Sequence, residues 1–129
     1  MKRNHALIAV TALCLALLSA GKLRSEEAKA EEKVDVSATI VGVEYQGTKM
    51  WLPGTVFAKK GNKVRIKVIN KIPGEGTTHG FAIDAFEVKK VVAQGATETV
   101  TFTADKEGIF PIYCQLHPAH VGGQLVVLP

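Results

Sequence analysis

The chain has 129 residues, with 16 Lys and Arg, 12 Asp and Glu, and a formal net charge of +4. A hydrophobic share of 47% and a charged share of 22% exclude a disordered or collagen-like chain, and the length is that of one ordinary domain. Residues 1–30 carry five basic and two acidic side chains, whereas the remaining residues carry 11 basic and 10 acidic side chains. Because the excess of positive charge lies mostly in residues 1–30, no nucleic-acid partner is expected.

The first 30 residues have the features of an export signal. A positive start (MKRNH) precedes an apolar run over residues 6–20, which is too short to span a bilayer comfortably. Small-residue cleavage sites follow near residue 21 and near residue 30. We therefore predict a signal peptide over residues 1–30, a periplasmic or otherwise exported protein, and no membrane span in the mature chain. An uncleaved membrane anchor is the alternative.

The chain from residue 34 onward is predicted to form many short strands. Residues 34–44 alternate apolar with polar side chains, as a half-buried strand does, and residues 64–69 alternate again. Gly and Asn turn signals recur at the spacing of a sandwich, and no segment after residue 33 has helical periodicity. The other predicted strands are residues 52–57, 79–83, 87–92, 97–103, 108–113 and 124–128. The pattern predicts an all-β sandwich of about seven to eight strands.

Removal of the predicted signal leaves one cysteine and three histidines, namely Cys114, His79, His117 and His120. Three of the four lie in residues 114–120 (CQLHPAH), on a loop between two predicted strands, and His79 opens a strand whose end can reach that loop. A thiolate with imidazoles is a ligand set suited to copper or zinc. One alternative is an inert buried cysteine with surface histidines. Another is a Cys–His catalytic pair, which lacks an orienting Asn or Asp and a helix N-terminus.

The sequence resembles the cupredoxins, a family of small copper proteins with a Greek-key sandwich, over about residues 50–128. The likeness is densest over residues 78–86 (THGFAIDAF) and 102–128. Cupredoxins place one His before a short strand, and a Cys, a His and a weak axial Met together on the last loop. The resemblance implies a cupredoxin domain over residues 31–129 and one copper ion, cycling between Cu(I) and Cu(II), in a plane of His79, Cys114 and His117.

Two members of the family resemble parts of the chain more closely. Residues 114–120 are similar to the loop of amicyanin, whose axial methionine falls on His120. Residues 80–86, 102–106 and 114–118 look closer still to nitrosocyanin, a red copper protein that has a glutamate where His79 stands. Because the loop lacks a methionine, the resemblance implies His120 as the fourth ligand, with a solvated loop histidine as the alternative. Met50 is far upstream in sequence, and Glu75 is expected to be a solvated loop carboxylate.

The resemblance implies one main function and one alternative. The main one is one-electron transfer to redox protein partners, which would dock on an apolar rim around His117 formed by Pro118, Ala119, Val121 and Gly122. The alternative is a nitrosocyanin-like protein that binds or converts a small ligand such as nitric oxide at an open copper position. Copper storage or delivery, and zinc binding, are further alternatives. A carrier is expected rather than an enzyme.

Overall fold

The computed structural model describes residues 32–74 and 77–129. Within this range the chain belongs to one compact unit, Glu31–Pro129. The predicted signal peptide and Glu75 lie outside the described residues. Among the residues that are described, no helix is long and apolar enough to cross a membrane.

Four strands form the first sheet, in the order β2-β1-β4-β7. They are β1 (Val36–Tyr45), β2 (Thr48–Leu52), β4 (Lys63–Asn70) and β7 (Thr97–Thr103). The turn residues between β1 and β2, Gln46 and Gly47, have φ of 50° and 78°, as a tight two-residue hairpin requires. β1 also pairs with β4 in parallel, so the sheet is not a simple meander.

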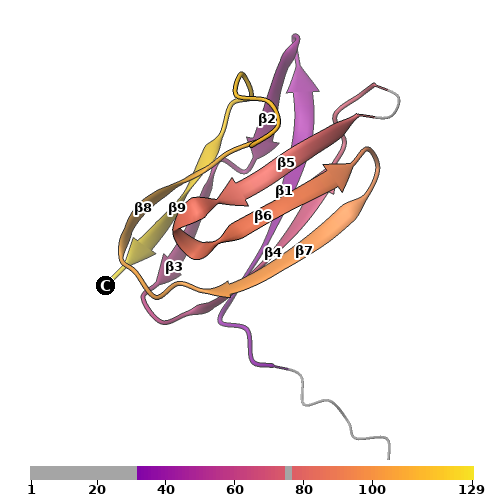
Figure 1. Ribbon diagram of the computed structural model, residues 1–129. Helices are drawn as coiled ribbons and strands as arrows, with labels where there is room; N and C mark the ends of the chain where they lie inside the picture. Colours follow the sequence, from indigo (N-terminus) through magenta and orange to yellow (C-terminus); the bar gives the residue numbers. More distant parts are fainter. Residues whose placement is uncertain (1–31, 75–76) are drawn as a thin grey trace, which may run out of the picture. The chain divides into compact units, whose positions relative to one another are not determined.

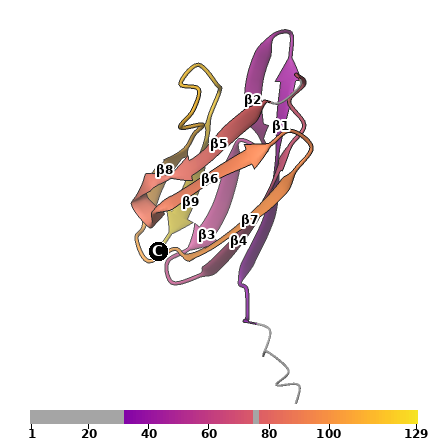
Figure 2. The same ribbon diagram turned by 45° about the vertical axis from the view of Figure 1, so that its right-hand side comes forward.

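The second layer consists of the sheet β3-β9-β8 with the hairpin β5–β6 attached to it. Tyr113, just beyond β8, exchanges backbone hydrogen bonds of 2.9 and 3.1 Å with Ala82 of β5. These strands are β3 (Thr55–Lys59), β5 (Thr78–Ile83), β6 (Val88–Ala93), β8 (Gly108–Ile112) and β9 (Gly123–Leu128), with a 3-10 turn η1 (Asp84–Phe86) between β5 and β6. In Figures 1 and 2 the loop between β8 and β9 lies at the same end of the sandwich as the β1–β2 hairpin.

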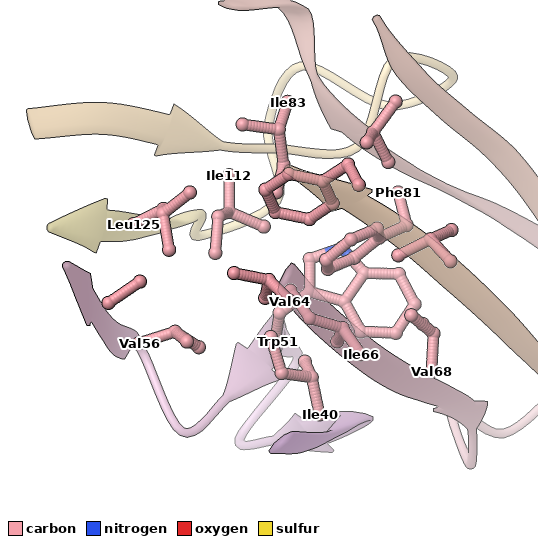
Figure 3. Packing of buried hydrophobic residues seen from close by; sticks show 14 of the residues in the cluster. Ile40, Trp51, Val56, Val64, Ile66, Val68, Phe81, Ile83, Ile112 and Leu125 are labelled. Atoms are coloured by element: carbon pink, nitrogen blue, oxygen red, sulfur yellow. The ribbon is translucent and has the colours of Figure 1, made fainter. Parts of the chain in front are cut away.

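The core lies between the two layers and is built by the alternation of each strand. Val64, Ile66 and Val68 of β4 are fully buried, because every second residue of a strand faces the same side. Trp51 and Phe81 pack edge to face from opposite layers, with ring centroids 5.8 Å apart (Figure 3). This packing holds β2 and β5 together, and these are two of the segments that border the candidate site.

The predicted all-β sandwich is confirmed, with nine strands and no α-helix among the described residues. The main difference concerns the segment 52–57, which was predicted to be one strand. The structure ends β2 at Leu52 and begins β3 at Thr55, with Pro53 and Gly54 between them. Proline has no N–H with which to continue a strand ladder, so the chain changes sheets at this point.

Candidate metal centre

His79 is held at the buried end of the site by strand β5. It pairs in register with Val92 of β6, and its side chain is only 1% exposed. Both of its ring nitrogens are buried and have no hydrogen-bond partner among the described residues. A buried polar atom without a partner costs free energy, so an unpaired imidazole here requires a further explanation, such as a metal ligand role.

Cys114 follows the Tyr113–Ala82 bridge that joins β8 to β5, and it is 2% exposed. Its Sγ accepts a hydrogen bond of 3.1 Å from the backbone N–H of Gly80. The residue next to His79 is therefore also the donor to the cysteine sulfur. Because Gly80 has no side chain, Gln115 passes close to it and donates a hydrogen bond of 2.9 Å to the carbonyl of Lys90 in β6.

The loop after Cys114 is wound tightly and tied to β2. The N–H of His117 donates to the carbonyl of Cys114 (3.2 Å), and that of His120 donates to the carbonyl of His117 (3.1 Å). The N–H of Val121 then donates to the carbonyl of Lys49 at 2.9 Å. These successive turns bring both loop histidines to the same place, and the bond to β2 fixes the end of the loop against the β1–β2 hairpin.

The structure brings all four predicted residues together: His79, Cys114, His117 and His120 offer ligand atoms that all lie within 4.8 Å of one another. Centroids of the imidazole rings are 4.6 Å apart for His79 and His120, 4.8 Å for His79 and His117, and 4.9 Å for His117 and His120. Sγ of Cys114 is 3.5 Å from Nδ1 of His117. His79 and Cys114 are buried, His120 is half-buried and His117 is exposed, so the cluster extends from the core to the surface.

Burial and like charge lower the pKa of two of the imidazoles, those of His79 and His120. Burial, followed by the charges of His120, His117 and Lys49, lowers the pKa of His79 to about 4. Burial, followed by the charges of His117 and Lys49, also lowers the pKa of His120. A neutral imidazole is the form that binds a metal ion, so both side chains have the required protonation state at neutral pH.

The donor set fits copper. One thiolate and three imidazoles combine soft and borderline ligands, and one ring nitrogen of His79, which has no hydrogen-bond partner among the described residues, lies within 4.8 Å of the other three donors. Met50 lies beside the loop, in a bridge with Val121, although the two are distant in sequence. By strand alternation its side chain belongs to the face of β2 opposite that of Trp51, which points into the core. Glu75 lies outside the described residues.

A pocket of about 380 Å³ opens beside the two loop histidines. It is lined by the hairpin residues Gly47, Thr48 and Lys49 and by the loop residues His117, Ala119 and His120. Lys49 and Gly80 are two neighbours of the cluster that were not predicted from the sequence. Gly80 could have been found, because it directly follows the predicted ligand His79 in the sequence. Nothing local in the sequence indicated that Lys49 lies beside the loop histidines.

Comparison with known proteins gives partial relatives that are named nitrous-oxide reductases. The chain is 43% identical over 56 residues to the nitrous-oxide reductase of Ralstonia nicotianae, a match that covers 43% of this chain and 9% of that protein. It is 34% identical over 73 residues to the nitrous-oxide reductase of Pseudomonas fluorescens, a match that covers 53% of this chain and 11% of that protein. The chain thus spans about a tenth of the length of these relatives.

Solved structures share the fold. The copper-containing nitrite reductase of Thermus scotoductus matches with a TM-score of 0.61 and 24% identity, over 73% of this chain and 28% of that one. Auracyanin from Roseiflexus castenholzii matches with a TM-score of 0.60 and 18% identity, over 75% of this chain and all of the other. The model of the cupredoxin-like domain matches residues 7–127. The chain therefore belongs to the cupredoxin-like domain family, and its His/Cys cluster fits a copper site.

Proposed function

We propose that this chain is an exported one-electron carrier that holds a single copper ion with His79, Cys114, His117 and His120. The observation that carries the proposal is the convergence of one thiolate and three imidazoles within 4.8 Å in a cupredoxin-like domain. Copper bound by imidazoles and a thiolate exchanges one electron between Cu(I) and Cu(II) with little rearrangement.

The surrounding backbone supports this role by holding the buried donors still. Cys114 is fixed by the bridge between Tyr113 and Ala82, and its sulfur is held by the N–H of Gly80. His79 is fixed by the pairing of β5 with β6. A site whose ligands are oriented by the fold changes little between two oxidation states, and this lowers the reorganisation that accompanies electron transfer.

The exposed edge of the cluster supports contact with a redox protein partner. His117 is exposed, and it is flanked on the loop by Leu116 and Val121, which are 43% and 50% exposed. Pro118 and Ala119 are exposed as well. An apolar surface of this kind favours transient docking, and it places a partner close to the imidazole edge from which an electron would leave. Export rests on the predicted signal peptide.

His120 favours a second candidate function, a red copper site that binds a small ligand. An imidazole is a stronger donor than the thioether of a methionine, so it favours Cu(II) and lowers the potential. His120 is also one of the residues that line the pocket beside the loop. A small molecule such as nitric oxide would reach the metal through this pocket, and the chain would then bind or convert a ligand in addition to carrying an electron.

The proposal is tested by the visible spectrum of the copper-loaded protein. A thiolate ligand gives an intense sulfur-to-copper charge-transfer band, and Cys114→Ser should abolish it. The serine variant should keep the far-UV circular dichroism of the wild type, because the substitution preserves side-chain size. A variant that retains its full colour, or a wild type that binds copper without the band, would overturn the assignment of Cys114.

His120→Met separates the two candidates. If the imidazole of His120 binds copper, the wild type should be green to red with a low potential, and the methionine variant should be bluer with a higher potential. Nitric oxide should then bind to the wild type more tightly than to the variant. Identical blue spectra and potentials for the two proteins would show that His120 is a solvated loop residue and that the protein is a simple carrier.

A further inference from the structure

We propose that the pocket between the β1–β2 hairpin and the ligand loop is a binding site for a small inorganic anion, with Lys49 as its counter-charge. The anion would bind next to His120, at the exposed side of the metal cluster. This inference rests on the proposed copper site, and it adds to it the charge class of the ligand and the residue that selects it.

Lys49 points toward the site rather than away from it. It lies two residues before Trp51 on β2, and alternate residues of a strand share a face. Trp51 on that face is buried in the core, and Lys49 is half-buried and lines the pocket with His117 and His120. The carbonyl of Lys49 accepts the N–H of Val121, so its backbone is fixed against the ligand loop.

The ammonium of Lys49 has no carboxylate partner in the described part of the chain. The cross-strand partner of Lys49 is Glu44, but the side chain of Glu44 is exposed and the two form no ion pair. Lys49 lines the same pocket as His117 and His120. Its positive charge therefore lies beside the cluster and is not neutralised by a described carboxylate.

The net charge of the loaded site favours an anion. A divalent copper ion with one thiolate has a net charge of about +1, and Lys49 adds a second positive charge at the same pocket. The pocket contains no carboxylate that would repel an anion, and the hydroxyl of Thr48 can donate a hydrogen bond. A neutral gas has no net charge to interact with the lysine, whereas a monovalent anion would be attracted by both the metal and the ammonium group.

Binding of an anion would be coupled to the oxidation state. Reduction to Cu(I) removes one positive charge from the site, so the anion binds the oxidised protein more tightly. By linkage, a tenfold preference for Cu(II) lowers the midpoint potential by about 59 mV at saturation. Lys49 would thus make the potential of the protein depend on the anion concentration.

The experiment uses azide as the probe, at constant ionic strength, with the copper-loaded chain. The affinity of the oxidised protein is measured from the visible spectrum, and the midpoint potential is measured with and without saturating azide. Lys49→Gln should weaken azide binding roughly tenfold, as expected for the loss of a charge–charge contact at a half-exposed site. Lys67→Gln is the matched control, because Lys67 is exposed on β4 and has no ion pair in the described residues. It should bind azide as the wild type does.

Two further variants sharpen the test. Lys49→Arg should retain most of the affinity, and Glu44→Gln should retain or increase it, since it removes the nearest opposite charge on the hairpin. The inference is overturned if Lys49→Gln and Lys67→Gln bind azide equally, or if the wild type shows a full thiolate band but no azide binding and no shift of potential. A wild type that lacks the thiolate band would instead overturn the copper site itself, and the anion site with it.

Discussion

Gly80 is the residue on which the geometry around the sulfur depends, and Gly80→Ala is expected to disturb it. A Cβ at this position would overlap Oε1 and Cδ of Gln115 and would lie 2.9 Å from its backbone nitrogen. Overpacking a close contact costs about 1–3 kcal/mol, and the loss of the hydrogen bond from Gln115 to Lys90 costs about 1 kcal/mol more. After a small gain from the lower chain entropy of alanine, we expect a loss of about 2–3 kcal/mol in the free energy of unfolding.

Urea unfolding of the metal-free protein measures this loss, and the copper-loaded protein gives a second readout. Movement of the loop would lengthen the bond of 3.1 Å from the N–H of Gly80 to Sγ of Cys114. A sulfur with a weaker hydrogen bond is a stronger donor, so the charge-transfer band should shift and the potential should fall. Gly54→Ala is the control, because a Cβ there meets no atom within 4 Å and the backbone is not left-handed. A loss below 1 kcal/mol with an unchanged spectrum would refute the reasoning.

A double-mutant cycle with Gln115→Ala identifies the cause. If the side chain of Gln115 is what the alanine displaces, the double variant should be more stable than the sum of the two single losses predicts. The contact of 2.9 Å to the backbone nitrogen remains in the double variant, so the rescue should be partial. Strict additivity would show that the Gln115 side chain is not involved.

Four further tests concern the ligand His79, the choice of metal, the pH dependence of stability and the hydrogen bond from Tyr113 to Asp84. His79→Ala should weaken copper binding severely in a chelator competition, because no other described His or Cys side chain joins the cluster. Copper should displace zinc from the loaded protein at equilibrium; resistance of bound zinc to excess copper would favour a native zinc protein. The metal-free protein should lose stability as the pH falls from 6.5 toward 4. Burial lowers the pKa of His79 to about 4 in the folded protein, so the unfolded chain takes up the proton first. In urea unfolding, His79→Gln should show a smaller change of the free energy of unfolding with pH. Tyr113→Phe should raise the pKa of Asp84, which the hydrogen bond from Tyr113 holds down, in an NMR titration of the carboxyl carbon.

The strands that could be predicted are those whose alternation is clean. Residues 64–69 fall within β4, and residues 97–103 coincide with β7. One face of each strand is buried, so apolar and polar residues alternate along the sequence. β2 was missed for a physical reason. Three of its five residues, Thr48 to Leu52, are buried or half-buried, but one of the three is a lysine, Lys49. Local hydrophobicity cannot separate such a segment from a loop.

The candidate ligands could be predicted because their residue types are rare in the chain and three of them are close in sequence. The supporting contacts could not. The bond from Gly80 to Cys114 joins residues 34 positions apart, and the pairing of Lys49 with Val121 joins the hairpin to the loop across most of the domain. Such contacts depend on bridges between segments far apart in sequence, namely Ala82 with Tyr113 and Met50 with Val121, which no local pattern encodes.

The buried and the accessible side of the cluster differ in rigidity and in charge. His79 and Cys114 are buried and fixed by strand pairing, which suits a site that must not change between oxidation states. His120 is only half-buried, on a loop whose neighbour in space is a charged hairpin residue, Lys49. The positive charge of this lysine would favour Cu(I) and so raise the midpoint potential of a copper site. A bound anion would offset that charge and lower the potential again. In the proposed anion site, a rigid inner pair of ligands would thus be combined with a charged, accessible outer edge, at which an anion would tune the potential of the carrier.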